Sequence, residues 1–253
     1  MVLLKPQVKK RMSNLIIAGT SINNISRELN LGKSTIYYHY KKIKGRKYKL
    51  PTVKVGYSSI DGEIIGIFIG DGSQHFERKS CHYTVNIHFG LKNIRYALYV
   101  KCMYQSFFNK KFRLEKSNPG SIRITTYSKE IFNFFKNYLD YEPKIKHCTV
   151  KLRTMKLPKR FKIGLLRGLW DTDGCIYNRE NRIRAVFYTT SQVLAQQVHQ
   201  ILIGMEIQNS VYTNNRKNRN EKTVYIVNVL KPSVDKFINM VKPLKARTVR
   251  GRW

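Results

Sequence analysis

Two short segments, residues 62–72 and 164–174, are dominated by apolar residues and carry glycines four residues apart. Gly62 and Gly66 in the first segment correspond to Gly164 and Gly168 in the second. Apolar residues at this spacing predict a helix, and glycines on one face remove the side chains that would keep a neighbouring helix at a distance. We therefore predict two helices that pack backbone to backbone about a pseudo-two-fold axis.

The pattern downstream of each glycine-spaced segment also repeats. Strand character is found at residues 82–89, 121–126, 182–189 and 223–229. Apolar residues at helical spacing are found at residues 93–100, 128–135, 191–198 and 233–240. The pattern in each half therefore predicts the order αββαββα. The predicted fold class is α+β, with one half at residues 56–156 and the other at residues 157–253.

Residues 8–44 predict a smaller all-α domain. A helix over residues 8–18 precedes a turn, and Ile22, Ile25 and Leu29 recur at the spacing of a second helix. A third helix over residues 34–43 is rich in polar residues and has Ile36 on its inner side. This order resembles a helix-turn-helix, whose last helix enters the major groove of DNA. A plain helical hairpin with a solvated basic face is the alternative.

We place the helix-turn-helix domain at residues 1–45 and a basic linker at residues 46–55. The residues of this domain expected to contact DNA are Lys33, Ser34, Thr35, Tyr37, Tyr38 and Lys41.

The charge of the chain narrows the choice of partner. The sequence has 48 Lys and Arg against 15 Asp and Glu, a formal net charge of +33. Such a charge on a chain with enough apolar residues for a core points to nucleic acid. The sequence has neither an apolar run of membrane-spanning length nor a signal-peptide pattern, so no membrane partner is expected. Four scattered cysteines favour a reducing, intracellular compartment, either the cytoplasm of a prokaryote or an organelle interior.

Each glycine-spaced helix ends in an aspartate, Asp71 or Asp173, followed by a glycine. The glycine is expected to take the left-handed conformation common at a helix end. A carboxylate is unfavourable beside the negative end of a helix dipole, and two neighbouring carboxylates repel each other. A divalent cation between them removes both penalties. An exposed, inert aspartate at a helix end is the alternative for either residue alone.

The two segments, IIGIFIGDG at residues 64–72 and LRGLWDTDG at residues 166–174, resemble the two signature motifs of the LAGLIDADG homing endonucleases. The first copy departs from the signature at Ile69, where the family has an aspartate. The resemblance implies a monomer with two saddle-shaped antiparallel sheets in the major groove. It also implies cleavage of both DNA strands with Mg²⁺ or Mn²⁺, bound by Asp71 and Asp173 with help from the carbonyls of Gly70 and Thr172.

The resemblance further implies a lysine near each metal site, at the end of the last strand of each half. Lys146 and Lys245 occupy comparable places after the matched helices, with Arg247 as a rival to Lys245. Plain phosphate-contacting cations are the alternative. The candidates for a residue that positions water are His88, Thr189 and Thr190.

Alternating polar side chains on the predicted strands are expected to recognise bases, since Arg reads guanine and Asn reads adenine. These candidates are Tyr83, Asn86, His88, Arg123, Thr125, Arg182, Arg184, Tyr188, Tyr225 and Asn228, together with Arg216 in a basic loop. The expected partner is double-stranded DNA with a long asymmetric target. The alternative is a non-cleaving binder on the same scaffold, either an intron RNA maturase with intron RNA as its partner or a transcription regulator.

Overall fold

The computed structural model describes residues 4–45, 53–78, 81–180, 182–214 and 222–246. The chain forms two compact units, residues 1–51 and residues 52–253. None of the described helices is long and apolar enough to cross a lipid bilayer.

The first unit is a three-helix cluster of α1 (Pro6–Ile17), α2 (Ile22–Leu29) and α3 (Lys33–Lys44). Its core consists of Met12, Ile16, Ile25 and Ile36, all fully buried. α1 begins two residues before the predicted helix, because proline suits the first helical position. Ser21 starts α2 by accepting a hydrogen bond from the Asn24 N–H, which otherwise has no partner in the first turn.

The second unit contains two halves with the same order of elements. The first half consists of α4 (Ser59–Asp71), β1 (Gly72–Glu77), β2 (His82–Gly90), α5 (Ile94–Phe108), β3 (Arg113–Lys116), β4 (Ser121–Tyr127) and α6 (Lys129–Phe135). The second half consists of α8 (Lys159–Thr172), β7 (Gly174–Arg179), β8 (Arg182–Thr189), α9 (Gln192–Ile203), β9 (Asn209–Asn214), β10 (Val224–Val229) and α10 (Val234–Val241). The predicted order αββαββα is confirmed in both halves.

Each half has one four-stranded antiparallel sheet, and the strand orders β1-β2-β4-β3 and β7-β8-β10-β9 are equivalent. Helices cover one face of each sheet, and a single apolar core runs through both halves. In the first sheet the buried pair Ile87 and Ile124 faces the helices, whereas Asn86 and Thr125 pair on the opposite side. We call the side away from the helices the polar face of each sheet.

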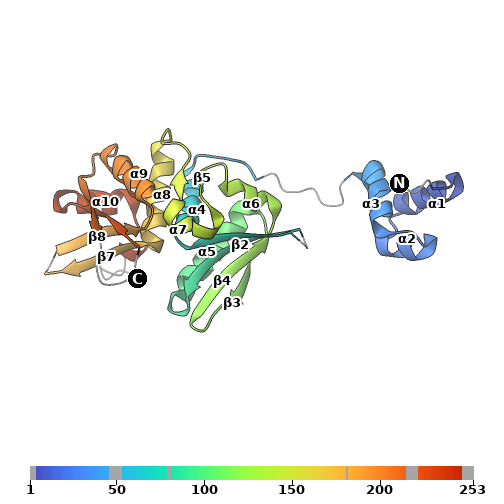
Figure 1. The fold of residues 1–253 in the computed structure, drawn as a ribbon, viewed down its shortest axis with the longest axis horizontal. Helices are drawn as coiled ribbons and strands as arrows, with labels where there is room; N and C mark the ends of the chain where they lie inside the picture. The colour runs from blue at the N-terminus through green and yellow to red at the C-terminus, as the bar shows by residue number, and fades with distance from the viewer. Residues whose placement is uncertain (1–3, 46–52, 79–80, 181, 215–221, 247–253) are drawn as a thin grey trace. The chain divides into compact units, whose positions relative to one another are not determined.

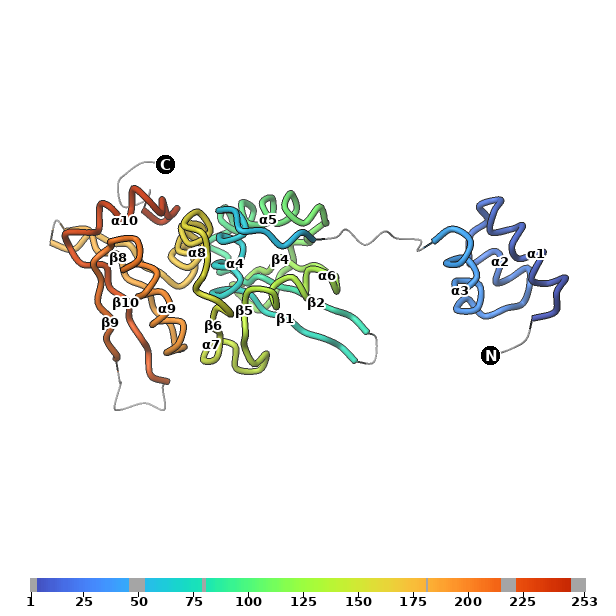
Figure 2. Tube along the Cα trace, turned by 90° about the horizontal axis from the view of Figure 1, so that it is seen from above, coloured from blue at the N-terminus to red at the C-terminus, as the bar shows by residue number. Residues whose placement is uncertain are grey.

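The motif helices α4 and α8 lie side by side at the centre of this unit (Figures 1 and 2). A Cβ at Gly164 would lie 1.8 Å from the Ser59 carbonyl oxygen, and one at Gly62 would lie 2.0 Å from that of Phe161. A Cβ at Gly66 or at Gly168 would lie 2.4 Å from a carbonyl oxygen of the opposite helix. The helices therefore pack backbone to backbone, as the glycine spacing predicts.

The expected left-handed conformation after each motif aspartate is wrong. Gly72 has extended backbone angles, with φ −83° and ψ 148°, and Gly174 is not among the positive-φ glycines of the described residues. Glycine is required there for space instead. A Cβ at Gly72 would lie 2.3 Å from the Phe68 ring, and one at Gly174 would lie 2.5 Å from the Trp170 Cα.

A segment that the sequence pattern does not predict connects the two halves. It contains β5 (Leu139–Asp140), the short helix α7 (Lys146–Thr149) and β6 (Lys151–Leu152), and β5 pairs with β6. These elements are too short to show a hydrophobic period. They place Lys146 and His147 beside the motif helices.

Candidate active site and nucleic-acid interface

The two motif aspartates lie at the adjoining ends of α4 and α8. Asp71 is the last residue of α4, and Asp173 is the residue that follows α8. The Asp173 Oδ2 atom lies 3.1 Å from the position that a Cβ at Gly70 would take, so this carboxylate lies against the end of the opposite helix. The close helix packing therefore brings the two acids together.

Each aspartate lines its own cavity, together with a residue of the opposite motif. Asp173 and Gly70 line a cavity of about 290 Å³, which also contacts His147, Thr189 and Thr190. The cavity beside Asp71 has a volume of about 320 Å³. It is lined by Thr172, Lys245, His88 and Asp171 among others. The three residues predicted to position water are thus divided between the two cavities, with His88 beside Asp71 and both threonines beside Asp173.

The protein around the two aspartates disfavours their charged forms. Burial and the nearby Asp173 carboxylate raise the pKa of Asp71 to about 7, and Lys245 and Lys146 only partly oppose this shift. Asp173 keeps an exposed side, yet loss of hydration raises its pKa too, against the pull of the same two lysines. Two carboxylates at raised pKa form a site that stabilises added positive charge.

The two predicted lysines bind the ends of the motif helices. The Lys146 Nζ donates to the carbonyl oxygens of Phe68 and Ile69, both at 2.7 Å. The Lys245 Nζ donates to Thr172 O at 2.8 Å and Gly174 O at 2.7 Å. Each ammonium group thus neutralises carbonyls at the negative end of one motif helix. Burial lowers the pKa of Lys146 to about 8, although Asp173 and Asp71 act in the opposite direction.

The expectation that these lysines end the last strand of each half is wrong. Lys146 is the first residue of α7, in the segment between the halves, and Lys245 follows α10. The rival Arg247 lies outside the described residues.

The donor atoms of the site fit a hard divalent cation. Asp71 and Asp173 offer carboxylate oxygens, and no group of three or more Asp, Glu, His or Cys side chains within the described ranges could hold a metal. A cation here would therefore complete its shell with water and phosphate oxygens, as Mg²⁺ does in phosphate chemistry. The Thr172 carbonyl already accepts a hydrogen bond from Lys245, so its second lone pair is the one left for a cation.

Sequence reasoning missed Asp171, at the signature position occupied by Ile69 in the first half. Its side chain is only 5% exposed, and its Oδ1 accepts from the Lys245 main-chain N–H at 3.2 Å. Burial raises the pKa of Asp171 to about 7. It also missed Glu63, which binds Arg167 of α8 at 2.9 Å and accepts from the Tyr99 hydroxyl at 2.9 Å. The contact between α4 and α8 is therefore held by an ion pair as well as by glycine packing.

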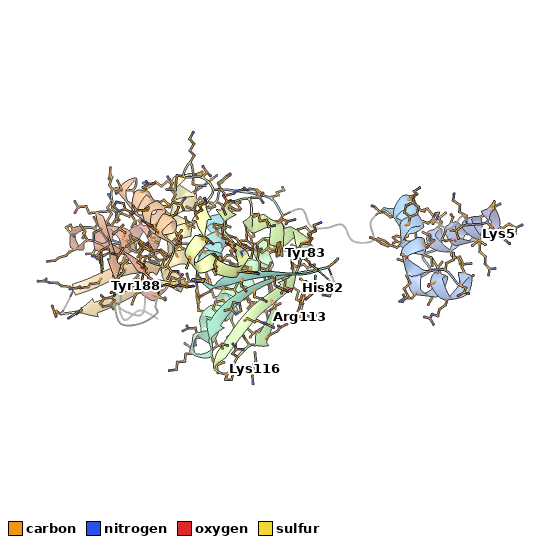
Figure 3. The ribbon with its side chains drawn as sticks, in the orientation of Figure 1. Lys5, His82, Tyr83, Arg113, Lys116 and Tyr188 are labelled. Atoms are coloured by element: carbon orange, nitrogen blue, oxygen red, sulfur yellow. The ribbon has the colours of Figure 1, made fainter. Side chains whose placement is uncertain are left out.

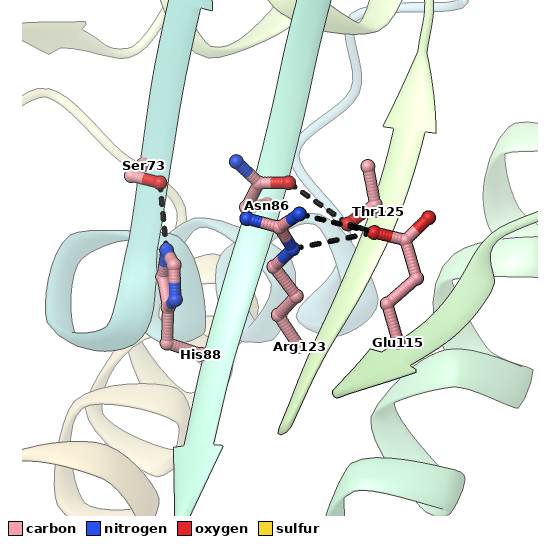
Figure 4. A network of polar contacts seen from close by, with 6 residues as sticks. All are labelled: Ser73, Asn86, His88, Glu115, Arg123 and Thr125. Atoms are coloured by element: carbon pink, nitrogen blue, oxygen red, sulfur yellow. Dashed lines mark hydrogen bonds and ion pairs between the residues drawn. The ribbon is translucent and has the colours of Figure 1, made fainter. Parts of the chain in front are cut away.

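The polar face of the first sheet carries most of the predicted base-reading residues of that half. Asn86, His88, Arg123 and Thr125 lie on it. Asn86 bonds Thr125, and both Thr125 and Arg123 contact Glu115 (Figure 4). His88 bonds Ser73 at 2.8 Å, and loss of hydration and the nearby Arg123 and Lys146 lower its pKa. Further residues of this face, absent from the prediction, include Ser73, His75, Glu77, Thr84, Arg113 and Glu115.

The prediction that Tyr83 shares this face is wrong. Tyr83 lies an odd number of residues from Asn86, so its side chain points to the helix-covered side. Its ring packs against Phe76 at 4.4 Å and Phe132 at 5.2 Å between ring centres. The next residue back, His82, lies on the polar face, and Figure 3 marks both at the start of β2.

The predicted residues of the second sheet are also divided between its polar face and its helix-covered face. Arg182, Arg184, Tyr188 and Asn228 lie on its polar face, as predicted. Tyr225 pairs with Thr189 on the helix-covered side and packs against the core, so the prediction for Tyr225 is wrong. Further residues of this polar face are Cys175, Tyr177, Arg179, Ser210 and Tyr212. The predicted Arg216 lies outside the described residues.

In the first unit, the six predicted DNA-contacting residues of α3 all reach solvent. Lys33, Ser34, Tyr37, Tyr38 and Lys41 are exposed, and Thr35 is half-buried. Lys42 lies over the Tyr38 ring at 4.6 Å from its centre. The outer side of α3 is therefore cationic and aromatic, which suits contact with a polyanion.

Known proteins share this architecture. Residues 160–241 match the family model of a LAGLIDADG-like domain. The crystal structure of I-DmoI in complex with DNA and Ca is 17% identical, with a TM-score of 0.59, over 78% of this chain and 99% of that chain. A structure of mesophilic variants of the homing endonuclease I-DmoI is 18% identical, with a TM-score of 0.57, over 73% of this chain and 91% of that chain. No curated protein is similar to the chain in sequence.

Residues 160–241 therefore carry a LAGLIDADG-like domain, and the second unit has the fold of the homing endonuclease structures that it resembles. At these identities the solved structures show the fold alone.

Proposed function

We propose that this protein is a site-specific DNA endonuclease that hydrolyses a phosphodiester bond in each strand of a long, asymmetric duplex target. The observation that carries the proposal is the pair of aspartates at the adjoining ends of α4 and α8, each with a raised pKa and each lining a separate cavity. Two such sites on one rigid scaffold suit cleavage of two strands. The similar I-DmoI structures include complexes with DNA and Mn or Ca, which supports divalent-cation use.

The residues of each site supply the conditions for phosphodiester hydrolysis. A divalent cation, when bound, activates water near neutral pH and stabilises charge on the leaving 3′-oxygen. Asp71 and Asp173 would hold that cation through their carboxylates. Lys146 and Lys245 hold fixed positive charge at the helix ends and lower the cost of a phosphate beside the carboxylates. His88, Thr189 and Thr190 line the cavities with groups that can orient a water molecule.

The polar faces of the two sheets are proposed to lie along the major groove. They are rich in Arg, Tyr, Asn and Thr side chains and point away from the helices that cover the other faces. The net charge of +33 favours a partner that contacts many phosphates, so affinity should fall steeply with salt.

Cleavage of a randomised duplex library tests this function. In Mg²⁺ or Mn²⁺ the cut molecules are expected to share one long motif, with both strands cut at fixed positions, and EDTA should prevent cutting. Binding of a motif without cutting in either metal would overturn the nuclease and support a non-cleaving binder on the same scaffold.

The first unit is proposed to extend the DNA contact through α3. Replacing either Lys33 or Lys41 by alanine should lower affinity for all sequences and reduce the slope of log affinity against log salt by about one. Lys10→Ala is a control of equal charge on α1, where Lys10 is exposed. Salt-dependent binding measured by fluorescence anisotropy gives both slopes. Equal effects of the α3 and α1 changes would argue against α3 as a DNA-contacting helix.

A further inference from the structure

An arginine and a glutamate stand opposite each other on the polar face of the first sheet. Glu115 of β3 and Arg123 of β4 are direct cross-strand partners. The Arg123 Nε and Nη2 atoms lie 3.3 and 3.2 Å from the Glu115 Oε2 atom (Figure 4). A guanidinium group has five donors in a rigid fork. With its Nε side turned to the glutamate, Arg123 keeps its outer Nη1–Nη2 edge for another acceptor, and no described residue occupies that edge.

The Glu115 carboxylate also contacts a more deeply buried residue of the sheet, Thr125. The Thr125 hydroxyl lies 3.3 Å from Glu115 Oε2 and 2.9 Å from Asn86 Oδ1, and Asn86 and Thr125 pair across the strands. Thr125 is 1% exposed and Asn86 is 9% exposed, whereas the Arg123 side chain is 37% exposed. The cluster therefore has a buried base and a solvent-facing arginine. Within the described ranges, no donor contacts the second carboxylate oxygen of Glu115.

A glutamate is unexpected at this place. The sequence has 15 acids against 48 basic residues, and a carboxylate on a DNA-facing sheet repels phosphate. The strands of the second sheet have no described acid on their polar face, and Arg184 there has no described carboxylate partner. Unspecific attraction to DNA therefore does not account for Glu115. Orientation of Arg123 does, because the pair fixes the direction of the outer guanidinium edge.

We infer that Arg123 and Glu115 form a guanine-reading pair, in which Glu115 is the positioning residue. This inference rests on the proposed binding of DNA by the polar faces. The outer edge of Arg123 can donate to O6 and N7 of one guanine in the major groove. The remaining Glu115 oxygen is an acceptor for the N4 amino group of a cytosine. The pair thus specifies one G·C base pair in the part of the target that the first sheet contacts.

The test compares the DNA motifs selected by the full-length protein and its variants from a randomised duplex library, in EDTA and at one salt concentration. Arg123→Lys keeps the charge but loses the two-pronged donor edge. It should reduce the preference for G·C at one position of the motif by about 5- to 150-fold. Glu115→Gln should weaken the preference at the same position, while affinity for all duplexes stays equal or rises.

Two matched variants serve as controls. Glu206→Gln removes the same charge from an exposed residue that binds Lys236, and it should leave the motif unchanged. Arg184→Lys makes the arginine change on the second sheet and should leave the Arg123 position intact. Thermal unfolding of each variant confirms its fold.

Two results would overturn the inference. The first is that both Arg123→Lys and Glu115→Gln select the same motif as the wild-type protein. The second is that the two variants lose preference at different positions of the motif. Either result overturns the inference and leaves the proposed function intact. If the wild-type protein selects no motif, the proposed function fails and the inference fails with it.

Discussion

Replacing Asp71 by asparagine is expected to make the metal-free protein more stable and to abolish DNA cleavage. Burial and the Asp173 carboxylate raise the pKa of Asp71 to about 7 from its ordinary value of 3.8. An acid with a raised folded-state pKa lowers stability wherever it is charged, because the unfolded chain ionises it without that cost. The penalty is absent below pH 4, grows between pH 4 and pH 7, and is complete above pH 7.

At pH 8 the gain from Asp71→Asn is expected to be on the order of 2–4 kcal/mol in the free energy of unfolding. It should vanish as the pH falls towards 4. Mg²⁺ should raise the melting temperature of the wild-type protein more than that of the variant, because the cation offsets the same repulsion. Denaturation in urea across this pH range, with and without Mg²⁺, measures both effects.

Cleavage should change in the opposite direction. Loss of a carboxylate proposed to hold the cation is expected to lower the rate of double-strand cutting by on the order of 10³-fold or more, with DNA binding retained. Asp140→Asn is the control, because Asp140 is a half-buried acid paired with Arg153 at 3.0 Å. It should change stability by less than about 0.5 kcal/mol and leave cutting intact. An Asp71→Asn protein that is no more stable at pH 8, or that still cuts, would contradict the assignment.

Part of this site can be predicted from the sequence alone. The motif helices could be predicted because the glycine pattern occurs twice and has a steric reason. Glycines four residues apart permit a contact between helix backbones that no other residue permits. Asp71 and Asp173 followed from the same alignment, since both end such a helix. The structure adds that Gly72 and Gly174 are required for space beside Phe68 and Trp170, which no local conformational rule indicates.

The errors on the strands have a different origin. Tyr83 and Tyr225 have an apolar ring and a polar hydroxyl, so their residue type fits either face of a sheet. Strict alternation from Asn86 and Asn228 would have placed both tyrosines on the helix-covered side. The parity of the two positions therefore indicates the correct face, whereas the residue type alone does not.

The contacts of Lys146, Glu115 and Asp171 could not be foreseen from the chain. Lys146 lies in a connection whose strands have two residues each, too short for any period to show. Glu115 meets Arg123 only because β3 and β4 pair in one particular register. Asp171 binds the main chain of Lys245, far along the sequence, so its role depends on how the second half closes.

Gly164→Ala is expected to be the most destabilising single methyl group that can be added to this protein. The new Cβ would lie 1.8 Å from the Ser59 carbonyl oxygen and 2.9 Å from the Glu63 nitrogen. Both neighbours are backbone atoms of α4, so no side chain can rotate away and the two helices must separate. We expect a loss of at least about 3 kcal/mol in the free energy of unfolding. Cleavage should also fall, because the separation moves Asp71 away from Asp173.

Gly204→Ala is the matched control for this change. Gly204 ends α9 with φ −64°, and an added Cβ there meets its nearest atom, the Gln200 carbonyl oxygen, at 3.4 Å. An alanine fits this conformation and restricts the unfolded chain, so stability should stay equal or rise by up to about 1 kcal/mol. Urea denaturation followed by circular dichroism measures both variants. Equal stability of Gly164→Ala and Gly204→Ala would mean that α4 and α8 can move apart without cost, and the close helix contact would then not be what holds the two aspartates together.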